Sequence, residues 1–278
     1  MTAIVGVFRE AEFSPGRVED DAAILERTAA ALVADGLEVR LGSADLTAAP
    51  DVVAILAMCQ SPAALTALDA RATSVPVINT PQAIRSCYRK ATARLLAAAG
   101  VRFPATRIVR TSSPTAPDAA PCWVKRGDVH AMAAEDVLFA EDGGAVTDAL
   151  AAFATRGIVW AALQEHVEGT VVKFYGVADG RFFRCYSNAP EPPASIPVLW
   201  GSAHAGAAAL GLEVFGGDLV VTPSGAPVLI DVNDWPSFAR CREEAADAIA
   251  GYVHDRLAGA ARAGGAEPRR AHARQARA

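Results

Sequence analysis

The first 84 residues alternate short apolar runs with segments of helical periodicity. Helical patterns cover about 20–34 and also begin at Ser61-Pro62 and at Thr80-Pro81. Four apolar runs predict strands, at residues 3–8, 37–41, 52–57 and 75–79. Strands that alternate with helices predict a doubly wound parallel sheet, in which ligands bind near the carboxyl ends of the strands.

After residue 84 the pattern changes to that of an α+β arrangement. Helices are predicted over 85–99, 145–154, 203–210 and 242–257. Strands are predicted around 106–109, 122–125, 136–139, 158–165, 171–178, 181–186, 217–222 and 227–232. The turn at Asp179-Gly180 makes a hairpin of the strands predicted at 171–178 and 181–186.

The composition excludes several classes of protein. The chain has 278 residues, 52% of them hydrophobic and 21% charged, which excludes collagen-like, low-complexity and fully disordered chains. The opening MTAIVGVF lacks the basic segment of a signal peptide, and no apolar run approaches the roughly 20 residues that span a bilayer. We therefore expect a cytoplasmic protein without a membrane partner. Five cysteines without a CxxC pair argue against a disulfide framework or a zinc site.

Basic residues are concentrated at the carboxyl end of the chain. Residues 259–278 hold five Arg and one Glu in a segment without apolar periodicity, whereas the whole chain has a formal net charge of −5. The remaining residues are therefore strongly acidic. We expect residues 259–278 to form a disordered basic tail, and the acidic body disfavours nucleic acid as a partner.

Lysine is rare in this chain, because 23 of the 26 basic residues are Arg and only Lys90, Lys125 and Lys173 are Lys. Lys125 lies in PCWVK and Lys173 in VVKFYGV, both of which are predicted strands. An ammonium among apolar residues is costly unless it meets an anion, so the three lysines favour a polyphosphate site. Two alternatives stay open, namely chance retention and side chains that reach solvent from an edge strand.

The segment GDLVVTPSGAPVLIDVNDWPSF contains a candidate metal site. Asp218 begins one predicted strand, while Asp231 and Asn233 end the next, and residues two apart in a strand share a face. Three oxygen ligands on adjacent strands suit Mg²⁺. The alternative is that Asp231 and Asn233 are turn residues after a strand. The alternation places Asp234 on the opposite face, outside the site.

A further candidate is QEHVEG at 164–169, a strand exit whose backbone groups could bind the edge of a purine. Ordinary strand exits have the same pattern. No GxxxxGK[ST] phosphate loop is present, and no GxGxxG follows the first predicted strand. The commonest sequence motifs for ATP and dinucleotides are thus absent.

Four segments, in this order, resemble the ATP-grasp superfamily in its RimK-type and glutathione-synthetase-like branch. They are RKATARLLAAAGVRFPAT, WVKRG, LQEHVEGTVVKFYGV and GGDLVV…LIDVNDWPSF. The resemblance implies an α/β fold in which a doubly wound parallel-sheet domain, residues 1–84, precedes a two-lobed α+β ATP-grasp domain, residues 85–258. The small lobe would span about 103–166 and the C-terminal lobe about 167–258.

The resemblance also implies which residues bind ATP and its metal. Lys90 and Lys125 match basic residues that hold ATP phosphates, and main-chain groups of Glu165 and Val167 would meet adenine. Glu168 would substitute for the ribose-binding acid, which is replaced by Val171 here. The complete adenine hinge would be Gln164, Glu165, His166, Val167 and Glu168. The ligands of Mg²⁺, with Mn²⁺ as an alternative, would be Asp218, Asp231 and Asn233.

Three further residues are implied near the transferred phosphate. Lys173 matches a basic residue that faces phosphate or substrate, and His130 lies where family members fold a lid over the γ-phosphate. Arg184 is the candidate for stabilising a developing anion. The motif Asp-Val-Asn departs from the Glu-x-Asn of many ligases and is similar to that of inositol-phosphate kinases in the superfamily.

Three functions follow from these features. The first is an ATP-dependent ligase that activates a small-molecule or peptide carboxylate as an acyl phosphate for attack by an amine or thiol. The alternatives are a small-molecule kinase with a hydroxyl acceptor and a non-catalytic nucleotide-binding protein. We expect residues 9–17 and 58–60 to line the substrate site, and Arg240 and Arg242 favour an anionic substrate. The sequence leaves room for a homodimer.

Overall fold

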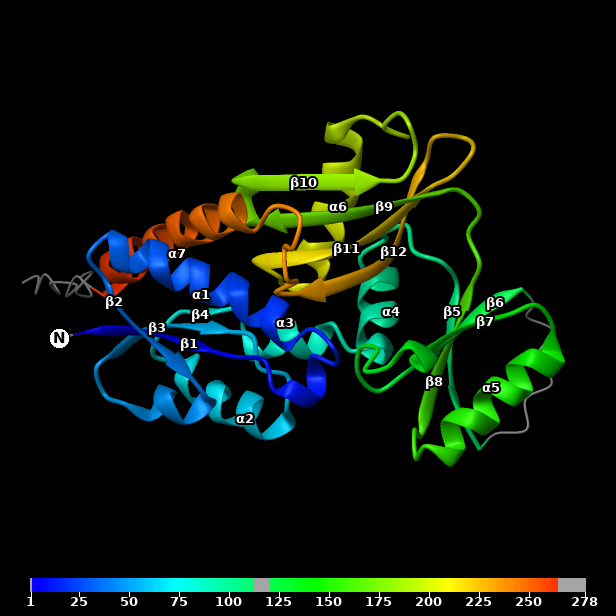
Figure 1. The fold of residues 1–278 in the computed structure, drawn as a ribbon, viewed down its shortest axis with the longest axis horizontal. Coiled ribbons are helices and arrows are strands. Elements are labelled where there is room, and N and C mark those ends of the chain that lie inside the picture. Colours follow the sequence, from blue (N-terminus) through cyan, green and yellow to red (C-terminus); the bar gives the residue numbers. More distant parts are fainter. Residues whose placement is uncertain (1, 113–120, 265–278) are drawn as a thin grey trace, which may run out of the picture.

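The computed structural model describes residues 2–112 and 121–264, and within these residues three four-stranded sheets form the framework (Figure 1). The N-terminal sheet is parallel throughout, with the strand order β2-β1-β3-β4. Its strands are β1 (Ala3–Val7), β2 (Glu38–Gly42), β3 (Val52–Ala57) and β4 (Val77–Ile78). Every residue of β1 is buried, as is typical of a strand covered on both faces. The predicted doubly wound sheet is confirmed.

The helices of this N-terminal part begin where their capping residues predict. The side chains of Ser61 and Thr80 accept hydrogen bonds from backbone N–H groups three residues on, and a proline follows each of them. The elements are η1 (Ala11–Phe13), α1 (Val18–Ala34), η2 (Ala44–Ala48), α2 (Pro62–Arg71) and α3 (Pro81–Ser86). Helices α2 and α3 cover one face of the parallel sheet, with Leu65, Leu68 and Ile84 buried against it.

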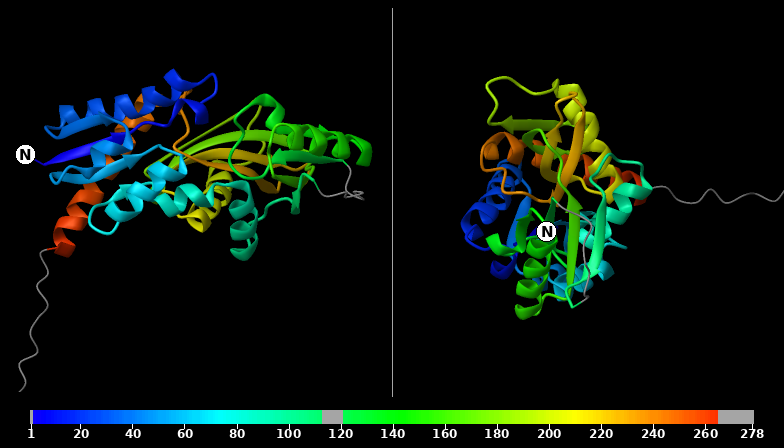
Figure 2. Two further views of the ribbon diagram at one scale, coloured as in Figure 1. Left: turned by 90° about the horizontal axis from the view of Figure 1, so that it is seen from below. Right: turned by 90° about the vertical axis from the view of Figure 1, so that its right-hand side faces the viewer.

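A second sheet is antiparallel, with the order β5-β8-β6-β7, and α5 (Gly143–Thr155) covers one face. Its strands are β5 (Thr106–Arg110), β6 (Cys122–Arg126), β7 (Val137–Ala140) and β8 (Trp160–Glu165), and η3 (Ala134–Asp136) precedes β7. This small lobe projects from the rest of the molecule (Figures 1 and 2).

The third sheet, in the order β10-β9-β11-β12, is also antiparallel and lies between the small lobe and the N-terminal part (Figure 1). Its strands are β9 (Thr170–Val177), β10 (Phe182–Ser187), β11 (Val214–Val221) and β12 (Pro227–Asp234), with η4 (Ala178–Gly180) between the first two. Helices α4 (Arg89–Ala98) and α6 (Ile196–Leu210) cover one face. The opposite face is turned toward the N-terminal part.

Two predicted helices have different bounds in the structure. The helix expected over 85–99 is divided, because Tyr88 has an extended backbone conformation between α3 and α4. The Tyr88 hydroxyl donates to the Gln60 carbonyl oxygen at 2.8 Å, which holds this interruption against the N-terminal sheet. The helix expected near 203–210 begins earlier, at Ile196, because Pro197 is tolerated in a first turn.

The last helix, α7 (Arg242–Gly264), packs against α1, so a segment expected in the C-terminal lobe completes the core of the N-terminal part. Residues 259–264 were expected in a disordered tail but form the end of this helix. Residues 265–278 of that predicted tail lie outside the described residues. None of the described helices combines the length and apolar composition that a membrane span needs.

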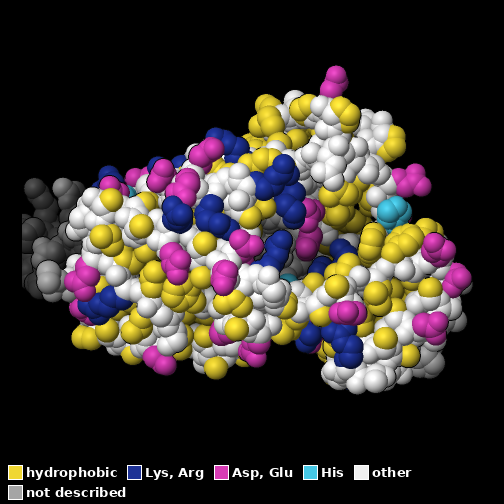
Figure 3. Space-filling view, viewed as in Figure 1, with side chains coloured by type: hydrophobic (Ala, Val, Ile, Leu, Met, Phe, Trp, Pro, Cys, Tyr) yellow, Lys and Arg dark blue, Asp and Glu magenta, His cyan; other side chains and the backbone are white. Residues whose placement is uncertain are grey.

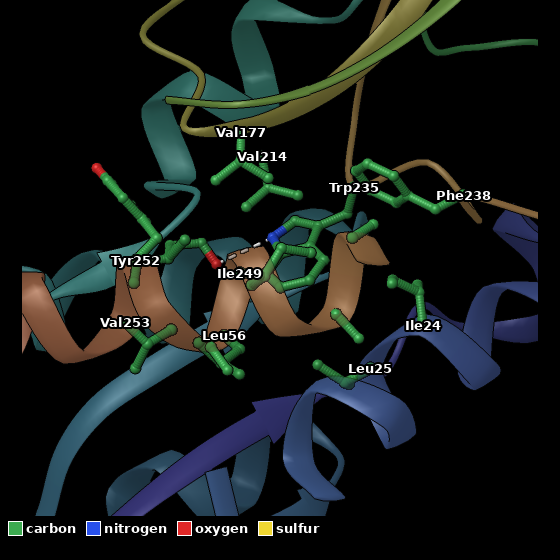
Figure 4. Packing of buried hydrophobic residues seen from close by; sticks show 14 of the residues in the cluster. Ile24, Leu25, Leu56, Val177, Val214, Trp235, Phe238, Ile249, Tyr252 and Val253 are labelled. Atoms are coloured by element: carbon green, nitrogen blue, oxygen red, sulfur yellow. Dashed lines mark hydrogen bonds between the residues drawn. The ribbon is translucent and has the colours of Figure 1, made fainter. Parts of the chain in front are cut away.

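Trp235 lies at the centre of the cluster that joins the two parts (Figure 4). Its side chain is fully buried among residues of α7 and of the β9–β11 face. Its indole N–H donates to the Ile78 carbonyl oxygen at 3.0 Å. Nearby, Asn79 bonds the backbone of Val214 in both directions, which connects the end of β4 to the start of β11. The parallel sheet and the third sheet are therefore connected through one buried cluster.

Replacing Trp235 by Ala is expected to lower the free energy of unfolding by about 3–5 kcal/mol, since it opens a cavity in this cluster. Trp235→Phe keeps an aromatic ring but leaves the Ile78 carbonyl without its donor, which should cost about 1–3 kcal/mol. Val33→Ala, at an exposed position of α1, is the control and should change stability by less than about 0.5 kcal/mol. Urea denaturation followed by circular dichroism measures all three. Equal losses for Trp235→Ala and Val33→Ala would contradict the central position of Trp235.

Candidate functional site

A row of polar side chains crosses the third sheet at one level. In the pairing register, Asp231 of β12 lies opposite Asp218 of β11, Asp218 opposite Lys173 of β9, and Lys173 opposite Tyr186 of β10. Directly paired residues share a face of the sheet, so the row faces the N-terminal part and the small lobe. Asn233 lies two residues beyond Asp231 on that face. The structure thus brings together the three predicted metal ligands and Lys173.

A local irregularity of β11 and β12 places the two carboxylates opposite each other. The register shifts between Asp218 and Leu219, so that Ile230 is the extra residue of a β-bulge. Gly217 is required at this point, because a Cβ atom there would lie 2.1 Å from the Asp231 carbonyl oxygen. A bulge bends a strand and redirects its side chains, and such irregularities are common beside functional sites.

The electrostatic surroundings of the two carboxylates differ. Burial raises the pKa of Asp218, although Lys173 Nζ lies 3.0 Å from its Oδ1 and opposes this rise. Burial would also raise the pKa of Asp231, but the charges of Arg89 and Lys125 outweigh it and hold the pKa below its ordinary value. Asp231 is therefore an anion at neutral pH, surrounded by cations from the small-lobe side.

Arg89, rather than Lys90, lies at the site. Arg89 Nη1 is 3.5 Å from Asp231 Oδ1, and its largely buried Nε has no hydrogen-bond partner among the described residues. The Lys90 ammonium instead lies 4.4 Å from the centre of the Trp160 ring, on the other side of the helix start. The assignment of Lys90 to the ATP phosphates stays a prediction, and the geometry places Arg89, rather than Lys90, beside Asp231.

Lys125 lies on β6, where its side chain is only 7% exposed. It forms no ion pair with a described residue, and burial lowers its pKa to about 8. A buried ammonium without a carboxylate partner is costly, so an anion that enters this space would be strongly attracted.

A cavity of about 240 Å³ lies between the third sheet and the small lobe. One wall is apolar and is formed by Val171, Val220 and Ile230. The opposite wall contains Trp123, Val137 and the strand exit after β8, and Lys125, Arg89, Asp218 and Asp231 lie at its polar end. A flat apolar slot with charges at one end suits a planar heterocycle that carries an anionic chain.

The predicted hinge residues occupy different positions around this cavity. Gln164, Glu165, His166 and Val167 line it, whereas Glu168 is exposed and does not. The Glu165 backbone N–H already donates to the Ala105 carbonyl oxygen at 2.9 Å. The backbone N–H and C=O of Val167 have no hydrogen bond to another described residue, so Val167 offers both a donor and an acceptor.

The His166 ring lines the cavity and also belongs to a small aromatic group. The Trp123 indole N–H donates to its Nδ1 at 3.2 Å, and the Phe139 ring lies edge-on at 5.2 Å. These contacts hold the strand exit after β8 in place.

A larger cavity of about 810 Å³ adjoins the first one at Asp218 and Val171. It lies between the third sheet and loops of the N-terminal part, and Figure 3 shows the hollow with basic and acidic side chains at its walls. Lys173, Asp218 and Asn233 line its floor. Both loops that were predicted to line the substrate site contribute to the wall. The first supplies Arg9, Phe13, Ser14, Pro15 and Arg17, and the second supplies Gln60. The row of polar residues therefore borders both cavities.

His130 and Arg184, the other two predicted catalytic residues, have different surroundings. His130 lines the larger cavity, burial lowers its pKa, and its Nε2–H donates to the Phe13 carbonyl oxygen at 2.9 Å. The loop after β6 thereby contacts the N-terminal part. Arg184 points elsewhere: its guanidinium pairs with Glu244 of α7, and it does not line either cavity. The structure does not bring Arg184 into the site.

Asp234 belongs to the site environment, although strand alternation placed it outside. It is 3% exposed, and both of its carboxylate oxygens accept hydrogen bonds from the Gln60 amide. Arg9 lies beside it and donates to the carbonyl oxygens of Asp234 and Trp235 at 3.1 and 2.9 Å. At the end of β12, Asp234 is covered by Gln60 and Arg9 of the N-terminal part, and a local pattern cannot reveal these contacts.

The donor set fits a hard cation bound together with phosphates. Two carboxylates and the Asn233 amide oxygen supply oxygen ligands, and Mg²⁺ beside phosphates typically takes one or two carboxylates. The partnerless Arg89 Nε and the buried Lys125 ammonium fit the phosphates themselves. In the described part of the chain, no group of three or more His, Cys, Asp or Glu side chains is placed to hold a metal without such help.

Solved structures of other proteins share this fold. No model of a known protein family matches the chain, and no curated protein does. Among solved structures, it is similar to the D-alanine–D-alanine ligase from Coxiella burnetii, with a TM-score of 0.72, 12% identity, and 95% and 97% of the two chains covered.

Two further structures extend this similarity. The D-alanine–D-alanine ligase from Bacillus anthracis complexed with ATP has a TM-score of 0.70 and 11% identity, with 95% of this chain and 100% of that chain covered. A RimK domain ATP-grasp protein from Sphaerobacter thermophilus has a TM-score of 0.65 and 22% identity, with 91% and 100% covered. The chain therefore shares the fold of these ligases and of the ATP-grasp protein, and this is the fold that the resemblance of its sequence motifs implied.

Proposed function

We propose that this protein is an ATP- and Mg²⁺-dependent ligase, which activates a carboxylate as an acyl phosphate and joins it to an amine or thiol. The observation that carries the proposal is the polar row from Asp231 to Lys173, which borders a slot for a nucleotide on one side and a larger cavity for organic substrates on the other. The solved relatives with this fold include ligases, one of them with bound ATP.

The smaller cavity would hold the nucleotide. Its apolar walls would enclose adenine, whose edge would meet the free backbone groups of Val167. Arg89 and Lys125 would bind the phosphates, replacing the water that an anion loses on entry. Asp218, Asp231 and Asn233 would hold Mg²⁺, which supplies positive charge to the phosphate oxygens during transfer.

The reaction would take place where the two cavities meet. A substrate carboxylate oxygen attacks the γ-phosphorus while the bond to ADP breaks, and the amine or thiol then attacks the acyl carbon as phosphate leaves and a proton is released. Lys173, beside Asp218 at this junction, would place its charge near the substrate carboxylate and the transferred group. No nucleophilic side chain is needed for either step.

Arg89 and Lys90 provide a test of where the phosphates lie. Arg89→Gln should raise the KM for MgATP by about 10- to 100-fold, because it removes a charge-assisted contact. Lys90→Gln removes a charge of the same sign one residue away, over Trp160, and should change KM less than about threefold. ADP release is measured with a coupled enzyme assay. A larger effect of Lys90→Gln than of Arg89→Gln would restore the sequence-based assignment.

The pKa of Lys125 predicts how the affinity for MgATP depends on pH. Its pKa of about 8 means that the ammonium is charged below pH 8 and becomes neutral above it. Since a polyphosphate favours the charged form, the affinity for MgATP should be greatest below pH 8 and fall by up to about tenfold per pH unit above it.

Isothermal titration calorimetry of wild type, Lys125→Arg and Lys125→Met measures this dependence. Lys125→Arg remains charged and should show a flat profile, while Lys125→Met should bind weakly at every pH. A fall above pH 8 that persists in Lys125→Met would assign the titration to another group and contradict this role.

The metal ligands and the chemistry are tested together by hydroxylamine trapping. Wild type with MgATP and a carboxylate substrate should form a hydroxamate, and Asp231→Asn should lower the rate at least about 100-fold. Asp45→Asn, an exposed carboxylate far from the site in η2, is the matched control and should retain the wild-type rate. A stable phosphorylated product without hydroxamate would contradict the ligase and indicate the kinase.

A further inference from the structure

The larger cavity has an excess of positive charge that its own side chains do not balance. Arg9 pairs with Asp21 and lies 3.8 Å from Asp234, and Lys173 pairs with Asp218. Arg17 and Arg240 also line the cavity, but neither forms an ion pair with a described residue. Two guanidinium groups therefore remain available at its wall.

Neighbouring arginines behave differently, so the lack of partners is not a general property of this surface. Arg27 pairs with Glu243, Arg184 with Glu244 and Arg242 with Asp20. Arg27, Arg184 and Arg242 lie outside the cavity. Of the three arginines that line the cavity, Arg9 is paired with a carboxylate, whereas Arg17 and Arg240 form no ion pair with a described residue.

Arg240 is held in a defined position relative to the polar row. Its guanidinium lies 4.2 Å from the centre of the Tyr186 ring, and the Tyr186 hydroxyl is 3.5 Å from the Arg240 carbonyl oxygen. Tyr186 pairs with Lys173, which pairs with Asp218. Adjacent strands are about 4.8 Å apart, so roughly 10 Å separates the strand of Asp218 from that of Tyr186.

Arg17 approaches the same region from the start of α1. The ion pair between Asp20 and Arg242, at 2.9 Å, joins the first turn of α1 to the segment that contains Arg240. Arg17 and Arg240 both line the larger cavity, and the charges of Lys173 and Arg17 oppose the rise that burial causes in the pKa of Tyr175, another lining residue. Two separate loops therefore bring positive charge to the wall of this cavity.

We propose that the carboxylate substrate carries a second anionic group at its far end and that Arg17 and Arg240 bind this group. The proposal rests on the proposed ligase function, which places the reacting carboxylate at Asp218 and Lys173. The substrate is then a dicarboxylate, or a carboxylate with a distal phosphate, that spans roughly 10 Å between its two charged ends. A guanidinium fork binds either anion through paired N–H donors.

Calorimetric titration of the MgADP-loaded protein tests the proposal with suberate, whose two carboxylates are separated by a suitable chain. Its half-amide, suberamate, is the matched probe with one charge fewer. Suberate should bind at least about tenfold more tightly than suberamate. Arg17→Gln and Arg240→Gln should each weaken suberate binding by about 10- to 100-fold and leave suberamate and MgADP affinity unchanged. The ω-phosphono acid of the same length distinguishes a distal phosphate from a carboxylate, according to which of the two binds more tightly.

Arg27→Gln is the control, because Arg27 is an exposed residue of α1 outside the cavity, and it should bind suberate as wild type does. Equal affinity for suberate and suberamate in wild type, no suberate binding at millimolar concentration, or unchanged binding in both arginine variants would overturn the proposal. The ligase function fails separately: a protein that shows the predicted suberate pattern but forms no hydroxamate retains the anion site and is not a ligase.

Discussion

The structure depends on one buried cation, the guanidinium of Arg9. It donates to the Asp21 carboxylate at the start of α1 and to the carbonyl oxygens of Asp234 and Trp235 at the end of β12. Its side chain is only 11% exposed, and the planar fork reaches partners that a single ammonium could not reach at once. The position of the N-terminal part relative to Asn233 follows from these bonds, and with it the shape of the larger cavity.

The two cavities differ in how far the protein itself neutralises their buried cations. Where a cation has a carboxylate partner, as Arg9 has in Asp21, the protein satisfies that charge itself. Where cations lack that partner, as Lys125 does, the cost of burial is offset only when an anion arrives. Incomplete neutralisation among the described residues thus singles out Lys125 as a candidate for binding an anion.

Most elements and part of the site were predictable from the sequence. Strong apolar runs and proline-containing helix starts located the parallel sheet, and residues two apart in a hairpin placed Asp231 and Asn233 on one face. What failed depended on contacts between distant segments. The interruption at Tyr88 sets the rotation of α4 and so decides which of Arg89 and Lys90 faces Asp231. Arg184 pairs with Glu244, which lies 60 residues away, and therefore does not face the cavities. Asp234 was left outside the predicted site because Arg9, which contacts it, is 225 residues away in the sequence.

The carboxyl-terminal helix has a consequence for how the chain is made. Since α7 supplies Ile249 and Val253 to the core that also contains Ile4 and Leu56, the N-terminal sheet emerges from the ribosome long before its covering layer exists. Domains usually fold as units during synthesis, starting from the N-terminus, but here the nascent parallel sheet has only α1 on the face that α7 later completes. Shortening the chain at its end would therefore impair the part that was translated first.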